Sequence, residues 1–224
     1  MRILALETSG FSGEVALLDG EQLVYASLLQ DGQRTAQSLA PGIQAALTAT
    51  GWQARDIQLV AVTIGPGSFT GLRVGVTTAK TFAYAVGCDV LGISTLDVIA
   101  AQTPPSADRA LWAVLDAQRS QLFAARYASL DGHWQSTSSP RIIDAQLWIE
   151  QLGSDLASGS GLQRLRAQLP PGQVMDESLW QPRAATVGQL AWRAYQAGRR
   201  DDLWKLSPHY LRASAAEEKA AERQ

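Results

Sequence analysis

Residues 65–73 have the composition of a turn that binds an anion. Their sequence is Gly-Pro-Gly-Ser-Phe-Thr-Gly-Leu-Arg, between an apolar run and an apolar helical pattern. A glycine-rich turn that opens a helix presents backbone N–H groups to a phosphate or carboxylate, and Arg73 adds a bidentate donor. Alternatively, the glycines only permit a tight turn and close packing. The stretch is neither a Walker A loop nor a Gly-x-Ser-x-Gly nucleophile elbow. Its candidate contact residues are Gly65, Gly67, Ser68, Thr70 and Arg73.

Two carboxylates stand at equivalent places in the sequence pattern. Glu7 and Asp116 each end a short apolar run of the length of a buried strand. Facing each other across a cleft, they would form a pair able to hold Mg²⁺. The alternative is that each ends a strand and accepts backbone hydrogen bonds. We favour this second interpretation for Asp116 and leave both open for Glu7, which with Thr8 and Ser9 is a candidate nucleotide or partner contact.

The remaining reactive side chains do not form a recognisable constellation. His133 and His209 are far apart, and neither has a second histidine four residues away, as a helical metal site requires. Cys88 is the single cysteine, which excludes an internal disulfide and a thiolate zinc site. Spacing supports no Ser/His/Asp triad. The sequence therefore predicts no metal site and no catalytic group.

The elements that position these residues are an alternation of strands and helices. In the first hundred residues the pattern predicts β-β-β-α-β-α-β, with a hairpin at Asp19-Gly20 and helices at about 38–50 and 72–86. The second half repeats this order loosely, with a turn at Asp131-Gly132. We therefore expect a duplicated α/β fold: a lobe of residues 1–102, joined by the segment 205–224, and a second lobe of residues 103–204.

Several segments together resemble one protein family. The loop at 65–73, followed by Val74-Gly75, is similar to the G-P-G-S-F-T-G-L-R-I-G signature of the TsaB (YeaZ) family. Residues 3–9, 92–96, 116–119 (similar to D-A-R-R) and 208–212 (similar to P-x-Y-L-R) match in the same order. The chain departs from the family pattern at Glu7, where Asp is usual, at Gln37, where His is common, and at Ser120-Gln121, in place of Gly-Glu.

This resemblance implies a fold and a role. The fold is actin-like, of the sugar-kinase and actin superfamily, with duplicated ribonuclease-H-like lobes. The role is that of a non-catalytic scaffold in a cytoplasmic complex that adds threonylcarbamoyl to the adenosine next to the anticodon, in transfer RNAs that read codons beginning with A. The implied partners are a TsaD-like catalytic subunit, a TsaE-like ATPase subunit and transfer RNA through the complex, with a homodimer when the chain is alone. The chain itself would need no cofactor, and ATP and Mg²⁺ would belong to the complex.

Two other functions remain open from the residues. An ATP-dependent kinase or carbamoyltransferase of the same superfamily would use the loop and Glu7. A glycoprotease-like peptidase is the second alternative, a label given to relatives, although the sequence shows no nucleophile or metal site for it. The net charge of −2 gives no overall basic field for RNA, and no stretch reaches the length of a membrane span.

The two predicted helices of the first lobe carry few charges. Between Arg34 and Arg55 there is no charged residue, and from 57 to 88 only Arg73 and Lys80 are charged. A helix on the surface of a soluble monomer normally has a charged or polar stripe. We therefore expect this face to bind a partner, unless the second lobe covers it. The expected interface residues are Leu39, Ala45, Val74, Thr77, Thr78, Thr81 and Ala85.

Overall fold

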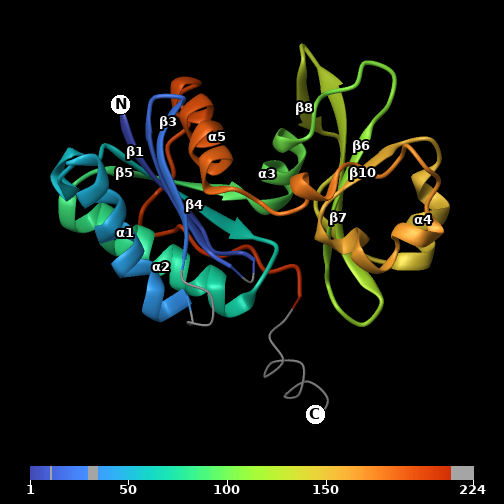
Figure 1. Cartoon of the computed structure of the whole chain (residues 1–224), viewed down its shortest axis with the longest axis horizontal. Coiled ribbons are helices and arrows are strands. Elements are labelled where there is room, and N and C mark those ends of the chain that lie inside the picture. Colours follow the sequence, from blue (N-terminus) through green and yellow to red (C-terminus); the bar gives the residue numbers. More distant parts are fainter. Residues whose placement is uncertain (11, 30–34, 213–224) are drawn as a thin grey trace, which may run out of the picture.

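The computed structural model describes residues 1–10, 12–29 and 35–212 as two lobes, each built on a five-stranded sheet (Figure 1). The first sheet has the strand order β3-β2-β1-β4-β5. β1 pairs antiparallel with β2 and parallel with β4, β2 pairs antiparallel with β3, and β4 pairs parallel with β5. The strands are β1 (Arg2–Glu7), β2 (Glu14–Asp19), β3 (Gln22–Leu28), β4 (Leu59–Gly65) and β5 (Asp89–Ser94).

Helices cover both faces of the first sheet. α1 (Thr35–Thr50) and α2 (Phe69–Val86) pack on one face, where β1 contributes Leu4 and Leu6. α5 (Ala184–Gln196) packs on the other face, against Ile3 and Ala5. Because both faces are covered, alternate residues of β1 enter two different cores, which explains why its sequence is apolar without interruption.

The second sheet repeats most of this topology. Its order is β10-β6-β7-β8, with β9 also paired to β7; β6 is antiparallel to β7 and parallel to β10. The order β8-β7-β6-β10 therefore corresponds to β3-β2-β1-β4, and the duplicated actin-like architecture is confirmed. The strands are β6 (Leu111–Asp116), β7 (Gln121–Leu130), β8 (His133–Ser136), β9 (Arg141–Asp144) and β10 (Leu156–Ser158).

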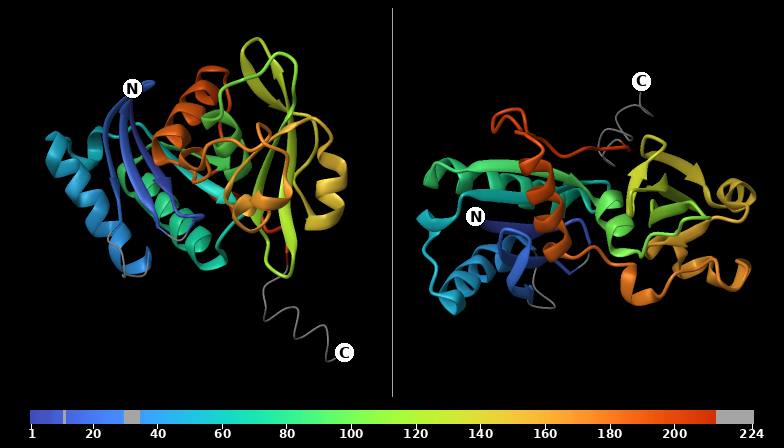
Figure 2. Two further views of the ribbon diagram at one scale, coloured as in Figure 1. Left: turned by 45° about the vertical axis from the view of Figure 1, so that its right-hand side comes forward. Right: turned by 90° about the horizontal axis from the view of Figure 1, so that it is seen from above.

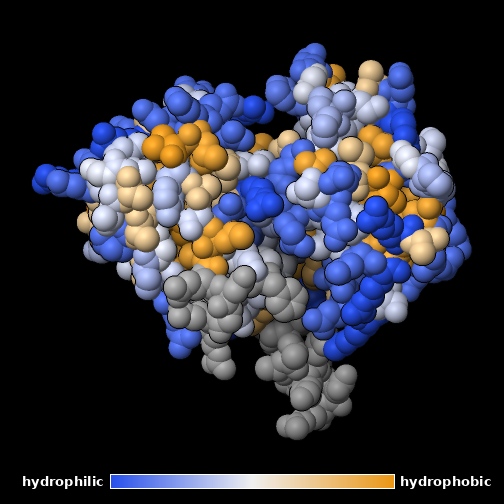
Figure 3. All heavy atoms as spheres, in the orientation of Figure 1, coloured by the Kyte–Doolittle hydropathy of each residue, from blue (hydrophilic) through white to orange (hydrophobic). Residues whose placement is uncertain are grey.

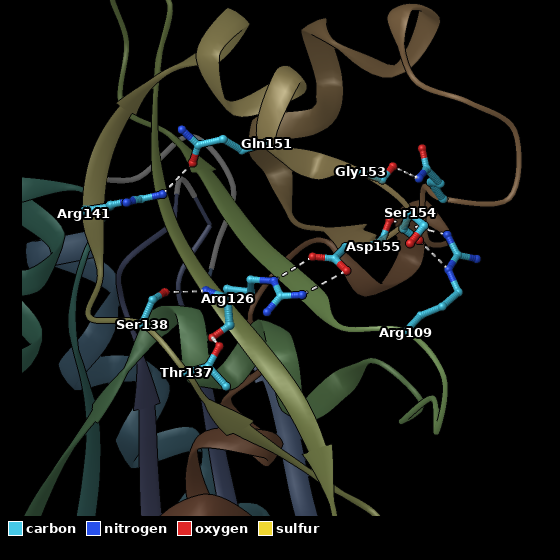
Figure 4. A network of polar contacts seen from close by, with 10 residues as sticks. Arg109, Arg126, Thr137, Ser138, Arg141, Gln151, Gly153, Ser154 and Asp155 are labelled. Carbon is cyan, nitrogen blue, oxygen red and sulfur yellow. Dashed lines mark hydrogen bonds and ion pairs between the residues drawn. The ribbon is translucent and has the colours of Figure 1, made fainter.

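The second lobe is covered by one helix and several short 3₁₀ turns. α4 (Ala145–Leu152) packs on one face, where Trp148 is fully buried. The 3₁₀ turns are η2 (Ser160–Arg164), η3 (Arg166–Gln168) and η4 (Glu177–Leu179); a fourth, η1 (Ala54–Asp56), lies in the first lobe. Arginines connect the segments around β10: Arg126 on β7 makes a bidentate contact with Asp155, and Arg109 donates to the carbonyl oxygen of Ser154 (Figure 4). Arg109 also donates to the carbonyl oxygen of Gly172.

α3 (Thr95–Gln102), which the sequence pattern did not predict, lies between the lobes (Figures 1 and 2). Its Leu96 and Ile99 pack against the second sheet, and its Val98 packs in the α5 core of the first. α5 belongs by its contacts to the first sheet, whereas the sequence division placed residues 184–196 in the lobe 103–204. The reason is that its apolar stripe, which includes Val187 and Ala191, completes the second face of that sheet.

Two helix boundaries also differ from the expected ones. α1 includes residue 35, so Pro41 lies inside the helix rather than in its first turn. Proline has no backbone N–H, so the Gln37 carbonyl oxygen receives no helical hydrogen bond from residue 41. Gln37 is exposed, and this oxygen can bond to water. α2 begins at Phe69 rather than at Leu72, because the Ser68 side chain caps it by accepting a hydrogen bond from the Gly71 N–H. The hairpin turns at Gly20 and at Asp131-Gly132 are confirmed, with positive φ at these residues.

Candidate functional site

The loop that precedes α2 packs closely on the end of β1. The Ser68 N–H donates to the Ser9 carbonyl oxygen at 2.8 Å. A Cβ on Gly67 would lie 2.6 Å from the Ser9 carbonyl oxygen, and one on Gly71 would lie 2.1 Å from the Thr8 carbonyl oxygen. Only glycine fits at these two positions, since real Cβ atoms do not approach backbone so closely.

This packing bears on the two interpretations of the loop. The N–H of Ser68 is donated to Ser9 and the N–H of Gly71 to the Ser68 hydroxyl, at 3.2 Å. Gly65 also lies within the protein, where an added Cβ would be 2.8 Å from the His209 carbonyl oxygen. Thr70 is exposed on the first turn of α2. The geometry favours close packing as the role of the glycines, and anion binding by the loop stays a prediction.

Beneath the loop lies a buried polar cluster centred on Glu7. Glu7 is 1% exposed and accepts hydrogen bonds from the Ser9 N–H at 2.7 Å and from the hydroxyl groups of Ser9 and Thr63. The Thr63 hydroxyl also accepts from the Thr8 N–H. Burial raises the pKa of Glu7 to about 7, against the smaller lowering effect of its hydrogen bonds from Ser9. Thr8 and Ser9 thus enclose this carboxyl group within the protein.

Asp116, the counterpart of Glu7, lies in a different environment. It is exposed and accepts a hydrogen bond from the Gln118 N–H at 2.7 Å, the role favoured for it from the sequence. Among the described residues there is no group of three or more His, Cys, Asp or Glu side chains able to hold a metal ion. His133 is exposed at the start of β8. The backbone N–H of His209 donates to the Ile64 carbonyl oxygen.

Arg73 makes its contacts with the C-terminal segment, which we define as residues 204–212. Its Nε donates to the Tyr210 hydroxyl at 2.9 Å, and its guanidinium carbon lies 3.9 Å from the centre of the Phe69 ring. The rings of Phe69 and Tyr210 stack with centroids 4.5 Å apart. Two separately matched motifs, residues 65–73 and 208–212, are therefore in direct contact.

The C-terminal segment continues along α2 and reaches the second lobe. Lys80 donates to the carbonyl oxygens of Trp204 and Leu206, at 3.1 and 2.9 Å. Arg212 donates to the carbonyl oxygen of Ala117 and to the side chain of Gln121. Sequence reasoning missed these contacts, because extended segments without periodicity give no packing signal. Residues at the start of the segment 205–224, which was expected to join the first lobe, therefore pack against α2 of that lobe. Residues 213–224 of that segment lie outside the described residues.

The outer face of α1 and α2 forms a shallow groove of about 450 Å³. Four expected interface residues line it on α2: Thr77, Thr78, Thr81 and Ala85. Sequence reasoning missed the other lining residues, because a groove depends on how two helices pack and not on either pattern alone. They are Ala40, Ile43, Gln44, Leu47, Ala54 and Phe82.

The other three expected interface residues do not line the groove. Leu39 is 1% exposed and Val74 is partly buried against the same core, so both belong to the packing beneath the helices. Ala45 is exposed on α1 but outside the groove. The second lobe lies beside the first, beyond α3, and does not cover α1 and α2 (Figures 1 and 2).

Hydrophobic residues also reach the surface elsewhere on both lobes (Figure 3). Leu23, Val24 and Leu28 are exposed on the edge strand β3, and Tyr84 and Trp204 form an exposed edge-to-face pair beside α2. Within the described part of the chain, no helix combines the length and apolar character needed to cross a bilayer.

Comparison with known proteins gives a consistent result. The family model for TsaD, tRNA N6-adenosine threonylcarbamoyltransferase, matches residues 32–154. The tRNA threonylcarbamoyladenosine biosynthesis protein TsaB of Escherichia coli is 29% identical, with 96% of each chain aligned. The TsaB protein of Bacillus subtilis is 27% identical over 68% of this chain and 66% of its own length.

A solved structure agrees on the fold. YeaZ from Pseudomonas aeruginosa superposes with a TM-score of 0.79 at 22% identity, covering 94% of this chain and 99% of that one. Three of the five segments that carried the resemblance are in contact: the end of β1, the loop before α2 and the C-terminal segment. Since the TsaD model spans more than half of the sequence, the chain belongs to the family which that model describes and, within it, to the TsaB (YeaZ) proteins.

Proposed function

We propose that this chain is a non-catalytic scaffold subunit in the formation of threonylcarbamoyladenosine in transfer RNA. In this role it supports modification of the adenosine next to the anticodon, in transfer RNAs that read codons beginning with A. The relatives named as TsaB biosynthesis proteins support the process. The observation that carries the scaffold role is the uncharged groove between α1 and α2, which faces solvent.

The groove has the properties of a protein-binding surface. Its lining combines apolar side chains with the small hydroxyl groups of Thr77, Thr78 and Thr81, and contains no charged residue. Contiguous exposed surface of this kind commonly marks an interaction site, and charged residues are depleted at interface centres. We assign the groove to a TsaD-like catalytic subunit, and to a second copy of this chain when that subunit is absent.

The surroundings of Glu7 support a role without catalysis. A carboxyl group that coordinates Mg²⁺ must be ionised and reachable. Glu7 is sealed beneath the loop, and burial raises its pKa to about 7, so the folded protein gives up this proton only near neutral pH. This weakens the kinase alternative, which needs Glu7 at an open site. In our proposal, ATP and Mg²⁺ belong to the complex, a TsaE-like ATPase is a further subunit, and transfer RNA binds through the assembled complex.

The test is depletion of this chain in its own cell, followed by mass spectrometry of transfer RNA nucleosides. We expect threonylcarbamoyladenosine to fall strongly and to return with the wild-type gene. Unchanged modification, with no second copy of the gene, would contradict the proposal. Turnover of ATP by the purified chain, abolished by Glu7→Ala, would instead support the kinase alternative.

The groove is tested in the same cells with Thr81→Lys. Thr81 is exposed and lines the groove, so the monomer should fold while a charge enters the interface. Association with the TsaD-like subunit should weaken at least tenfold by sedimentation, and modification should not be restored. Ala45→Lys is the matched control, because Ala45 is exposed on α1 outside the groove and should retain binding.

A further inference from the structure

Arg73 is held in one orientation by aromatic side chains. The Tyr210 hydroxyl accepts from Nε, and the guanidinium group lies over the Phe69 ring at 3.9 Å. Neither terminal nitrogen, Nη1 or Nη2, has a hydrogen bond to another residue within the described ranges. An arginine fixed through Nε and stacked on a ring keeps its two terminal nitrogens as a fork that matches a carboxylate.

This fork lies in line with the groove. Arg73 is exposed and begins a row of residues spaced four apart along α2, and the next three, Thr77, Thr81 and Ala85, line the groove. Residues four apart on a helix share one face. Arg73 therefore extends the groove-lining row by one turn toward the start of α2.

Arg73 is one of only two charged residues on α1 and α2. α1 has no charged residue, and the other cation of α2, Lys80, donates to two carbonyl oxygens of the C-terminal segment. A partner that buries the groove will also reduce the hydration of Arg73. Such a partner needs an acidic side chain opposite it, because an unpaired charge in an interface is costly.

We propose that Arg73 binds a carboxylate of the partner protein and that Tyr210 is the positioning residue that orients it. This inference rests on the proposed function, since it assumes that a TsaD-like subunit occupies the groove. A second copy of this chain is a poorer match, because neither α1 nor α2 carries an acidic residue. Nucleic acid is also disfavoured, since binding to phosphates requires several cations and, of the two cations on α1 and α2, Lys80 already donates to the C-terminal segment.

The experiment is titration calorimetry of the full-length chain against the TsaD-like subunit of the same organism, at two salt concentrations. Arg73→Gln should weaken binding about 10- to 100-fold, the range for hydrogen bonds between charged groups. Arg73→Lys should recover part of this loss, because a lysine keeps the charge but not the fork. Arg164→Gln, an exposed arginine of the second lobe, is the matched control and should bind as the wild type does.

Tyr210→Phe tests positioning, since it removes the hydroxyl that accepts from Nε and keeps the ring stacked on Phe69. We expect binding about threefold weaker, a shallower salt dependence and an unchanged melting temperature. Self-association of the chain, measured by sedimentation, should not weaken in Arg73→Gln.

Three results would overturn the inference. The first is that the Arg73→Gln variant binds the TsaD-like subunit with wild-type affinity while the Thr81→Lys variant no longer binds it. The second is an equal loss of self-association in Arg73→Gln, and the third is a loss of transfer RNA binding by the isolated chain without loss of partner binding. Failure of the wild-type chain to bind the TsaD-like subunit at all would contradict the proposed function itself, and is distinguishable from these.

Discussion

In the first lobe the acid that ends β1, Glu7, is 1% exposed and accepts a hydrogen bond from the N–H two residues on. In the second lobe the acid that ends β6, Asp116, makes the same contact with Gln118 but is exposed. The local hydrogen bond is shared, so the turn geometry does not decide the burial. What differs is the segment that follows the next parallel strand: an α-helix after β4, and a short 3₁₀ turn after β10.

The outer layers of the two lobes differ in a related way. In the first lobe, glycines bring α2 against β1, and the outer face of α1 and α2 remains a groove without charges. In the second lobe, Arg126 on β7 contacts the Asp155 carboxylate, and Arg109, just before β6, donates to the Ser154 carbonyl oxygen (Figure 4). Both lobes have apolar cores, but among the described residues the polar contacts around β10 have no counterpart at the outer face of α1 and α2, where the groove is lined without charges.

The largest effect is expected for Gly71→Ala, which tests the glycine packing of the first lobe. The added Cβ would lie 2.1 Å from the Thr8 carbonyl oxygen, and neither backbone segment can move freely. We expect a loss of about 3 kcal/mol or more in the free energy of unfolding, the upper end for overpacking. Gly42→Ala in α1 is the control. Its Cβ meets a flexible end of the Leu29 side chain, so its cost should stay below about 1 kcal/mol in urea titrations.

Glu7→Gln tests the buried carboxyl group through the pH dependence of stability. The pKa of Glu7 in the folded protein is about 7, against an ordinary value of 4.5, so the folded protein binds the proton more tightly. Glu7 therefore contributes its full stability below pH 4.5 and loses it as the pH rises to about 7, by roughly 3 kcal/mol in total. The variant lacks this group, so its stability relative to the wild type should rise between pH 5 and pH 8. A constant difference across that range would contradict a buried carboxyl group whose pKa is raised.

A smaller effect is expected in the second lobe for Asp155→Ala. The Asp155 side chain is 13% exposed and accepts from Arg126 at 2.7 and 3.2 Å. Arg126 is 42% exposed and can regain water, so we expect a loss of about 1–2 kcal/mol. Glu177→Ala breaks the exposed pair with Arg166 and should cost less than about 0.5 kcal/mol. Calorimetric unfolding would measure both, and equal costs would show that the bidentate contact has no special weight.

The sequence was sufficient for features that depend on local pattern. The succession of strands and helices along the first hundred residues up to β5, both hairpin turns and the low charge of α2 all follow from periodicity, glycine position and charge spacing. The placement of α5 in the second lobe differs from its contacts, because an apolar stripe such as that of Val187 and Ala191 does not indicate which sheet it packs against. Only the three-dimensional arrangement shows which face lacks a cover.

The candidate site was predictable as a set of residues but not as an arrangement. Spacing identified Arg73 and the loop, but the partner of Arg73 is Tyr210, 137 residues away. Leu39 was misplaced on the interface because an uncharged helix gives no signal for which of its sides is buried. Burial of Glu7 was equally invisible, because it depends on glycines more than 55 residues further along the chain.

The smallest effect is expected for Asp116→Asn, the counterpart of Glu7→Gln. Asn keeps an oxygen that can accept from the Gln118 N–H, and the side chain stays in water. The free energy of unfolding at pH 8 should change by no more than about 0.5 kcal/mol, as for most surface substitutions. The turn it supports holds Gln118, Arg119 and Ser120 at positive φ, so Asp116→Ala, which removes the acceptor, should cost more than Asn does. If Asn and Ala instead destabilised the protein equally, the carboxylate charge itself would be needed. Asp116 would then have to act together with another charged group, and the paired-carboxylate interpretation of the two lobes would have to be reopened.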